Sequence, residues 1–173
     1  MNEQLKPVEY KHHSSKAYID EFPVAYKQWK ADSHCNKNHG YSFSIIFHFG
    51  ANTLDKRGWV VDFGSLKPLK ETLKSLFDHK TIVAQDDPDL PFMQEMERKG
   101  IMNISILPAL GCELIADQLY KYMNAVFIPE TFGTSEANRI WCYKVEVHET
   151  QTNSGMRVGH REWNEDLFEE IIT

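Results

Sequence analysis

An alternating run of residues between positions 39 and 49 restricts the fold of this chain more than any other feature. Every second residue of the run is imidazole, aromatic or aliphatic, and these residues are His39, Tyr41, Phe43, Ile45, Phe47 and Phe49. Because side chains alternate between the two faces of a β-strand, all of them share one face. That face begins polar and reactive and ends apolar, which predicts a site at the mouth of a buried sheet.

The composition indicates a single globular domain over residues 1–173. Hydrophobic residues make up 42% of the chain and charged residues 25%, which is ordinary for a folded domain. The net charge of -6 and the lack of a Lys/Arg-rich block argue against a nucleic-acid partner. The apolar runs are too short to cross a bilayer and the first residues do not resemble a signal peptide. We therefore expect no membrane partner and a cytoplasmic location.

Hydrophobic periodicity predicts an α+β fold, with an antiparallel sheet and two helices on one of its faces. Strands are predicted at about 18–28, 39–50 and 142–149, with shorter extended segments at 59–62 and 101–107. Long helices are predicted from Ser65 to His79 and at about 111–127, with shorter ones at 92–99 and 160–173. Turn-forming and polar residues predict loops at 85–91, 129–138 and 150–159.

Cys35 is the first candidate functional residue, since it lies in a polar loop directly before the alternating run. A thiol ionises at neutral pH only beside a base, a cation or a metal, and histidines flank this one. An isolated loop cysteine usually has no role, but the surrounding histidines favour a functional thiol here. The other cysteines, Cys112 and Cys142, are too far apart in sequence to form a disulfide framework or a zinc-finger pattern.

Three acidic residues and one histidine are further candidates. Asp78 could fix the tautomer of His79 for proton transfer, or the histidine could only interact with the dipole at a helix end. Glu149 continues the apolar face of the last predicted strand, where a ligand with two adjacent N–H groups would satisfy it. Alternatively, that strand has reached the surface by residue 149. Glu113 opens the second long helix, where a negative charge is favourable in any case.

An ordered set of short motifs resembles one known family. The set comprises Cys35-x3-His39-Gly40-x-x-Phe43, Gly58-Trp59-Val60-Val61-Asp62-Phe63, Leu66-Lys67, Phe77-Asp78-His79, Glu113 and Val145-Glu146-Val147-His148-Glu149-Thr150. In this order, over residues 18–158, the motifs are similar to those of 6-pyruvoyl-tetrahydropterin synthases and the related 6-carboxy-tetrahydropterin synthases of queuosine biosynthesis. The spacing between Cys35 and His39 is more like that of the bacterial carboxy-synthase branch.

The resemblance implies a tunnelling fold, in which three subunits close their sheets into a barrel and two such trimers stack into a hexamer. It implies that Cys35 is the base and that Asp78 and His79 relay protons from a neighbouring subunit. It also implies that Glu149, with help from Glu113, anchors a pterin ring between subunits. The implied substrate is 7,8-dihydroneopterin triphosphate, and the implied cofactor is zinc.

The zinc ligands of this family are three histidines, and this chain keeps one of them. His39 is present, whereas Tyr26 and Tyr41 occupy the other two positions. Tyr41 shares a strand face with His39, but a neutral phenol is a poor zinc ligand. Three outcomes are open: another histidine substitutes, the metal binds weakly through His39, Cys35 and a tyrosinate, or the site contains no metal. The candidate substitutes are His34, which is best placed, His48, which has the opposite strand parity, and His12 and His13.

One main function and two alternatives follow from these observations. The first is a lyase like 6-carboxy-tetrahydropterin synthase. The alternative is a pterin- or purine-binding relative without the zinc chemistry, or a 6-pyruvoyl-tetrahydropterin synthase.

An insertion around residues 85–107 and an acidic tail are additional to the family pattern. Gly111 and Cys112 stand where the family has a threonine before its helix glutamate.

Overall fold

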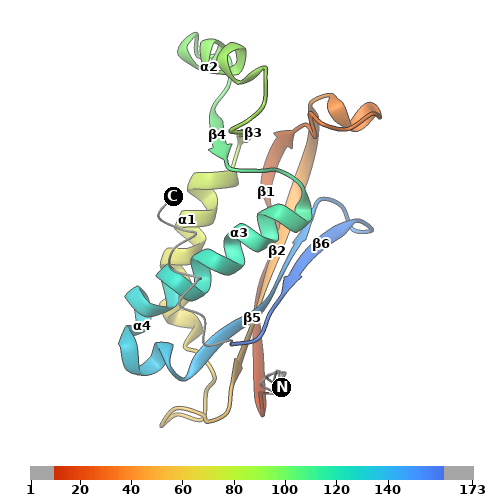
Figure 1. Cartoon of the computed structure of the whole chain (residues 1–173). Coiled ribbons are helices and arrows are strands. Elements are labelled where there is room, and N and C mark those ends of the chain that lie inside the picture. The colour runs from red at the N-terminus through yellow and green to blue at the C-terminus, as the bar shows by residue number, and fades with distance from the viewer. Residues whose placement is uncertain (1–9, 162–173) are drawn as a thin grey trace, which may run out of the picture.

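One curled six-stranded sheet dominates the protein, shown in Figure 1 as a computed structural model that describes residues 10–161. The strand order is β4-β3-β1-β2-β5-β6. In chain order the strands are β1 (His12–Tyr26), β2 (His39–Ala51), β3 (Lys80–Ala84), β4 (Ile104–Leu107), β5 (Ile140–His148) and β6 (Ser154–Val158). The helices are α1 (Lys67–Phe77), α2 (Leu90–Arg98), α3 (Cys112–Tyr122) and α4 (Ile128–Ala137).

The core lies between the sheet and two helices, as the periodicity predicts. On β2, the alternating residues Phe43, Ile45, Phe47 and Phe49 are fully buried, with 0% of each exposed. They pack in one cluster with buried residues of α1, such as Leu73, and with residues of α3. Both long helices therefore cover the same face of the sheet, whereas α2 lies beyond β3 and β4 at one end of the molecule (Figure 1).

The sheet is mixed, which corrects the prediction of an antiparallel one. β1, β2, β5 and β6 pair antiparallel in the order β1-β2-β5-β6, as expected. β3 and β4 add to the free side of β1 in parallel orientation, with α2 as the crossover. The prediction missed β3 because its short run, Thr81–Ala84, is buried and does not alternate.

Two predicted loops contain regular structure, and one predicted strand does not form. Residues 129–138 are mostly the helix α4, which tolerates Pro129 because proline lies in its first turn. Residues 150–159 contain the edge strand β6, and residues 59–62 form bends rather than a strand. α1 begins at Lys67 with no side-chain cap, so Ser65 is not its N-cap. The helix predicted at 160–173 lies almost wholly outside the described residues.

Candidate functional site

A pocket of about 230 Å³ lies at the edge of the sheet where four strands begin or end. Because neighbouring strands run in opposite directions, the end of β1 and the start of β2 meet the end of β5 and the start of β6. The first turn of α3 completes the wall. The lining residues are Tyr26, Gln28, Cys35, Tyr41, Cys112, Glu113, Glu149, Asn153 and Ser154.

Glu149 lies in the pocket with its carboxylate held by neighbours. The Tyr26 hydroxyl donates a hydrogen bond of 2.7 Å to its Oε2 atom, and the Asn153 amide donates one of 3.4 Å to Oε1. Its backbone N–H donates to the Asn153 carbonyl, which fixes the turn after β5. Of the two alternatives for Glu149, the structure therefore favours a partnered carboxylate at a pocket over a freely solvated one.

Burial controls the protonation of the groups around this carboxylate. Desolvation raises the pKa of Tyr26, which is 3% exposed, and its hydrogen bond to Glu149 raises that pKa further. Tyr26 is therefore a neutral donor at physiological pH. Burial, with the nearby Glu149 charge, also raises the pKa of Tyr41 and raises that of Cys112 to about 11. Both groups therefore stay protonated at neutral pH.

Cys35 faces the same pocket from a short 3-10 turn, His34–Asn36. The Ser33 hydroxyl accepts a hydrogen bond from the Cys35 backbone N–H, and the Gln28 N–H donates to the Cys35 carbonyl at 2.9 Å. The nearest imidazole to the thiol is His34, with its Nε2 atom 3.9 Å from the sulfur. The structure therefore brings Cys35 and Glu149 to one cavity, although they are far apart in sequence.

Asp78 and His79 do not line this pocket within one chain. The Asp78 carboxylate contacts Nδ1 of His79 at 2.7 Å, and 79% of the His79 side chain is exposed. His79 adopts a φ of 55°, a left-handed conformation that is unfavourable for a residue other than glycine. The His79 backbone N–H donates to the Pro23 carbonyl, which holds the residue against β1. The pair is therefore preorganised and faces outward.

Glu113 lines the pocket from the first turn of α3, as its position in the sequence predicts. Its carboxylate faces the positive end of the helix dipole. Close packing brings this turn to the pocket: a side chain at Gly155 of β6 would come within 2.4 Å of the Glu113 backbone nitrogen. The glycine thus allows β6 to approach the start of α3.

The residues at the family's three zinc-ligand positions do not form a metal site. The rings of Tyr26 and Tyr41 lie 5.1 Å apart and those of His39 and Tyr41 lie 6.4 Å apart, centroid to centroid. Both phenols are kept neutral, and the Tyr26 hydroxyl donates a hydrogen bond to Glu149. Between residues 10 and 161 no group of three or more His, Cys, Asp or Glu side chains has the spacing of a metal site. This donor set does not fit zinc.

None of the candidate substitute histidines completes a set of zinc ligands at this pocket. His48 contacts Glu146 at 2.6 Å on the sheet face opposite the core, as its parity predicts. His12 and His13 lie at the other end of β1, about 45 Å from Tyr26 at the usual rise per residue. His34 lies beside Cys35, with its ring 5.7 Å from that of His39. His34 is thus the nearest, but it adds only one imidazole to this end of the sheet.

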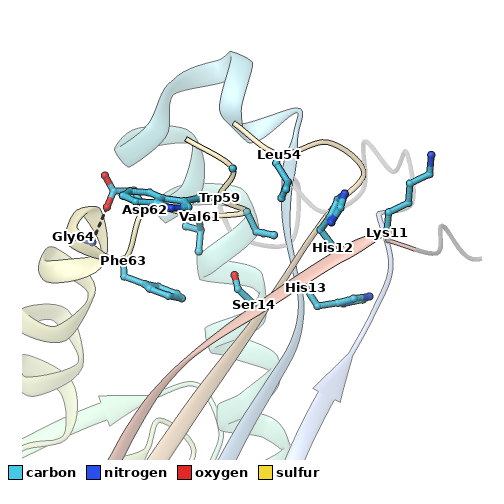
Figure 2. Close-up of a pocket in the computed structure, with 12 residues that line it drawn as sticks. Lys11, His12, His13, Ser14, Leu54, Trp59, Val61, Asp62, Phe63 and Gly64 are labelled. Atoms are coloured by element: carbon cyan, nitrogen blue, oxygen red, sulfur yellow. Dashed lines mark hydrogen bonds between the residues drawn. The ribbon is translucent and has the colours of Figure 1, made fainter. Parts of the chain in front are cut away.

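A larger cavity, of about 650 Å³, lies at the opposite end of the molecule. Figure 2 shows Trp59, Phe63 and Leu54 of the 54–64 loop around it, beside Ser14 of β1. The Gly58–Phe63 motif therefore lines this cavity rather than the pocket that contains Cys35 and Glu149. We assign the site to the smaller pocket, because that pocket contains the thiol and the carboxylates.

Four lining residues of the smaller pocket were not predicted as site residues: Gln28, Cys112, Asn153 and Ser154. Gln28 follows Tyr26 by two positions, so strand parity offered a signal. Asn153 and Ser154 come from the turn into β6, a strand that the sequence pattern did not reveal. No helix in the described part of the chain is long and apolar enough to cross a membrane.

The sequence matches a described family over most of its length. The family model for 6-pyruvoyl tetrahydropterin synthase matches residues 17–158. The 6-carboxy-5,6,7,8-tetrahydropterin synthase of Rickettsia conorii is 34% identical over 71 residues, which are 40% of this chain and 51% of that protein. Its counterpart in Rickettsia typhi is 39% identical over 57 residues, 32% of this chain and 41% of that protein. The chain thus spans about half the length, or less, of these curated relatives.

Solved structures share the fold at low identity. An uncharacterized protein from Wolinella succinogenes superposes with a TM-score of 0.70 at 19% identity, over 86% of this chain and 98% of that one. The 6-pyruvoyl tetrahydropterin synthase of Plasmodium falciparum gives 0.61 at 16% identity, over 88% and 100%. These likenesses confirm the α+β tunnelling fold. With the family match over residues 17–158, they show that the chain belongs to the 6-pyruvoyl tetrahydropterin synthase family.

Proposed function

We propose that the protein is a 6-carboxy-tetrahydropterin synthase-like lyase that acts on 7,8-dihydroneopterin triphosphate in the 7-deazaguanine pathway to queuosine. The observation that carries the proposal is the meeting of Cys35 and Glu149 in one pocket. The names of the Rickettsia relatives support the reaction class. The substrate, the pathway and the enzymatic activity belong to the proposal.

The proposed anchor for the substrate is the Glu149 carboxylate. A pterin presents a ring N–H beside an exocyclic amino group, and two carboxylate oxygens accept such a pair. Tyr26 and Asn153 each occupy one acceptor position, on Oε2 and Oε1 respectively. Each carboxylate oxygen accepts two hydrogen bonds, so Oε1 keeps one free position. Oε2 also accepts from the Cys112 thiol at 4.0 Å, a long contact that a ligand N–H would replace. Glu113 is the second acidic group on the wall.

The proposed chemistry divides between two subunits. Cys35 is the base that takes a proton from the bound substrate. Asp78 and His79 relay protons into the pocket of a neighbouring subunit, consistent with their exposed position outside the pocket of their own chain. This arrangement requires an oligomer, for which we propose the family's hexamer of two trimers. We further propose that the protein works in the cytoplasm.

Zinc would polarise the substrate side chain in this family. The two tyrosines at the ligand positions do not fit that ion, so no step of the proposed reaction goes through it. The same observation favours a second candidate: a pterin- or purine-binding relative that has lost the parent chemistry. In that case the Tyr26–Glu149 bond serves ligand binding alone.

Turnover of dihydroneopterin triphosphate by the purified oligomer, followed by chromatography, tests the lyase. Replacing Cys35 with alanine should lower kcat by at least about 100-fold, the usual contribution of a general base. Asn36→Ala is the matched control, because Asn36 lies in the same turn but does not line the pocket. It should retain activity.

Turnover that is equal in the Cys35→Ala and native proteins would remove Cys35 from the mechanism. An absence of turnover in the native protein, combined with tight pterin binding, would favour the second candidate. Absence of both turnover and binding would contradict both.

A further inference from the structure

We propose that the acidic turn, residues 86–89 after β3, is a positioning device that holds the segment carrying Gln28 and Cys35 at the pocket. The turn contains Asp86, Asp87 and Asp89, and it belongs to the insertion that is additional to the family pattern. It contacts the β1–β2 loop from the side away from the pocket. The inference takes the pocket to be the ligand site of the proposed function.

The inner arm of this device is a buried ion pair. The Lys27 ammonium lies 3.2 Å from Oδ1 of Asp87, whose side chain is 0% exposed, and it also contacts Asp89. Asp87 is itself fixed, because its Oδ1 accepts the Asp89 backbone N–H at 2.9 Å and its carbonyl accepts the N–H of Leu90. The turn is therefore rigid where it meets the end of β1.

The outer arm is exposed and involves Asp86 alone. Its Oδ1 accepts a hydrogen bond of 3.1 Å from the Trp29 indole N–H, and its Oδ2 lies 2.5 Å from the Lys30 ammonium. That ammonium also lies 4.8 Å from the Trp29 ring centroid, in a cation–π position. Hydrogen bonds from Trp29 and Lys30 lower the pKa of Asp86, so the arm stays charged at neutral pH.

Side chains 27–29 alternate in direction, so the contacts of both arms also fix residues that line the pocket. Lys27 and Trp29 point toward the acidic turn, and Gln28, between them, lines the pocket. The Gln28 backbone N–H donates to the Cys35 carbonyl at 2.9 Å, and the Gln28 carbonyl accepts the N–H of Ala31. Fixing residues 27, 29 and 30 therefore fixes both Gln28 and the turn that presents the Cys35 thiol.

The Gln28 amide occupies the space that the absence of a side chain at Gly111 leaves free. A side chain at Gly111 would come within 2.5 Å of Gln28 Nε2, and Gly111 has a φ of 115° that disfavours other residues. A primary amide has both a donor and an acceptor, and it lies on the same wall as the Glu149 carboxylate. Gln28 is thus suited to bind a lactam-like edge, with C=O beside N–H, of a heteroaromatic ligand.

Reactivity of the Cys35 thiol provides a test that needs no substrate. Cys112 and Cys142 are buried, so alkylation by iodoacetamide, mapped by mass spectrometry, reports on Cys35. Asp86→Ala should raise the alkylation rate of Cys35 at least threefold, because the loop loses its outer arm. Glu95→Ala is the matched control, since Glu95 lies in the same insertion and its ion pairs among residues 10–161 are with Arg98 and Lys99. Its rate should equal that of the native protein.

A change smaller than threefold in Asp86→Ala, or an equal change in Glu95→Ala, would overturn the positioning role. If Asp86→Ala does not fold, the double variant Trp29→Phe/Lys30→Met removes both contacts of the outer arm from the loop side and decides the question in the same way. Calorimetry with neopterin measures the effect on ligand binding. Asp86→Ala should weaken binding about fivefold and Gln28→Ala about tenfold. If the native protein binds no neopterin, the proposed function fails, while the alkylation comparison still decides the positioning role.

Discussion

One phenol and one carboxylate determine the character of this site. Tyr26 stands where the family has a zinc-binding histidine, and its hydroxyl donates a hydrogen bond to Glu149 instead of binding a metal. The bond joins the end of β1 to the end of β5 across β2. A position that binds metal in the family has therefore become a support for the proposed pterin anchor.

The strained backbone of His79 leads to a prediction about stability and turnover. A left-handed conformation costs a residue with a side chain about 1 kcal/mol relative to glycine. His79→Gly should therefore maintain or raise the free energy of unfolding, by up to about 1 kcal/mol, in urea denaturation. It should also lower turnover at least about 100-fold, because the proton relay is lost.

Asp20→Gly is the matched control for His79→Gly, because Asp20 has a similar φ of 51° but lies in the β1 bulge. Its activity should be unchanged. A His79→Gly protein that keeps full turnover would exclude His79 from the chemistry.

Individual site residues were predictable where a strand presents them. Two-residue periodicity located Tyr41 beside His39 and extended the apolar face of β5 to Glu149. Two-residue spacing from Tyr26 could also have located Gln28, whereas Asn153 was missed because the turn into β6 determines its position. Residue pattern alone also could not show that Asp78 and His79 lie outside the pocket of their own chain.

At the scale of elements, β2 and β5 are joined by an ion cluster on the face away from the helices. Glu146 contacts Lys144 at 2.7 Å and His48 at 2.6 Å, with His148 at 3.3 Å. Burial alone would raise the pKa of Glu146, but hydrogen bonds from Lys144 and His48 outweigh it and lower that pKa. The folded state therefore favours the ionised carboxylate.

This cluster predicts a specific acid sensitivity. A lowered pKa in the folded state stabilises the fold above the unfolded pKa of about 4.3, and the stabilisation is lost as the pH falls through the folded value. Between pH 5 and pH 3, Glu146→Gln should therefore lose less stability than the native protein, by about 1 kcal/mol. Urea titrations at each pH measure the difference, with the exposed Glu130→Gln as control. Parallel pH profiles for Glu146→Gln and the native protein would contradict the assignment.

The helices and strands that could be predicted from the sequence are the long ones that bury one face. β1, β2, β5, α1 and α3 each have one buried face, so their patterns are clear. β3 and β6 are five residues long and show no complete alternation. α4 was predicted as a loop. Pro129 fits its first turn, whereas Gly133, with a φ of 77°, leaves the helical conformation and kinks the helix. Tertiary packing decided these segments, and sequence pattern did not.

At the scale of the whole molecule, the proposed site is divided between positions that one chain does not bring together. The pocket with Cys35 and Glu149 is at one sheet edge, whereas His79 is exposed outside it. β6 is an edge strand, and β1 pairs with β3 only through residues 24–26. Such free strand edges are suited to pairing between subunits. This geometry supports the proposed barrel, in which a neighbour would complete each pocket.

The most direct test of this account is calorimetric titration of the native protein with neopterin, repeated for Glu149→Gln. The amide of the variant keeps the size of the side chain but replaces one acceptor oxygen with a donor. We predict one bound neopterin per chain in the native protein and binding at least about tenfold weaker in Glu149→Gln, a loss of about 1.4 kcal/mol. Glu130→Gln should bind like the native protein. Equal affinity in the native and Glu149→Gln proteins, or no binding by the native protein, would contradict the account.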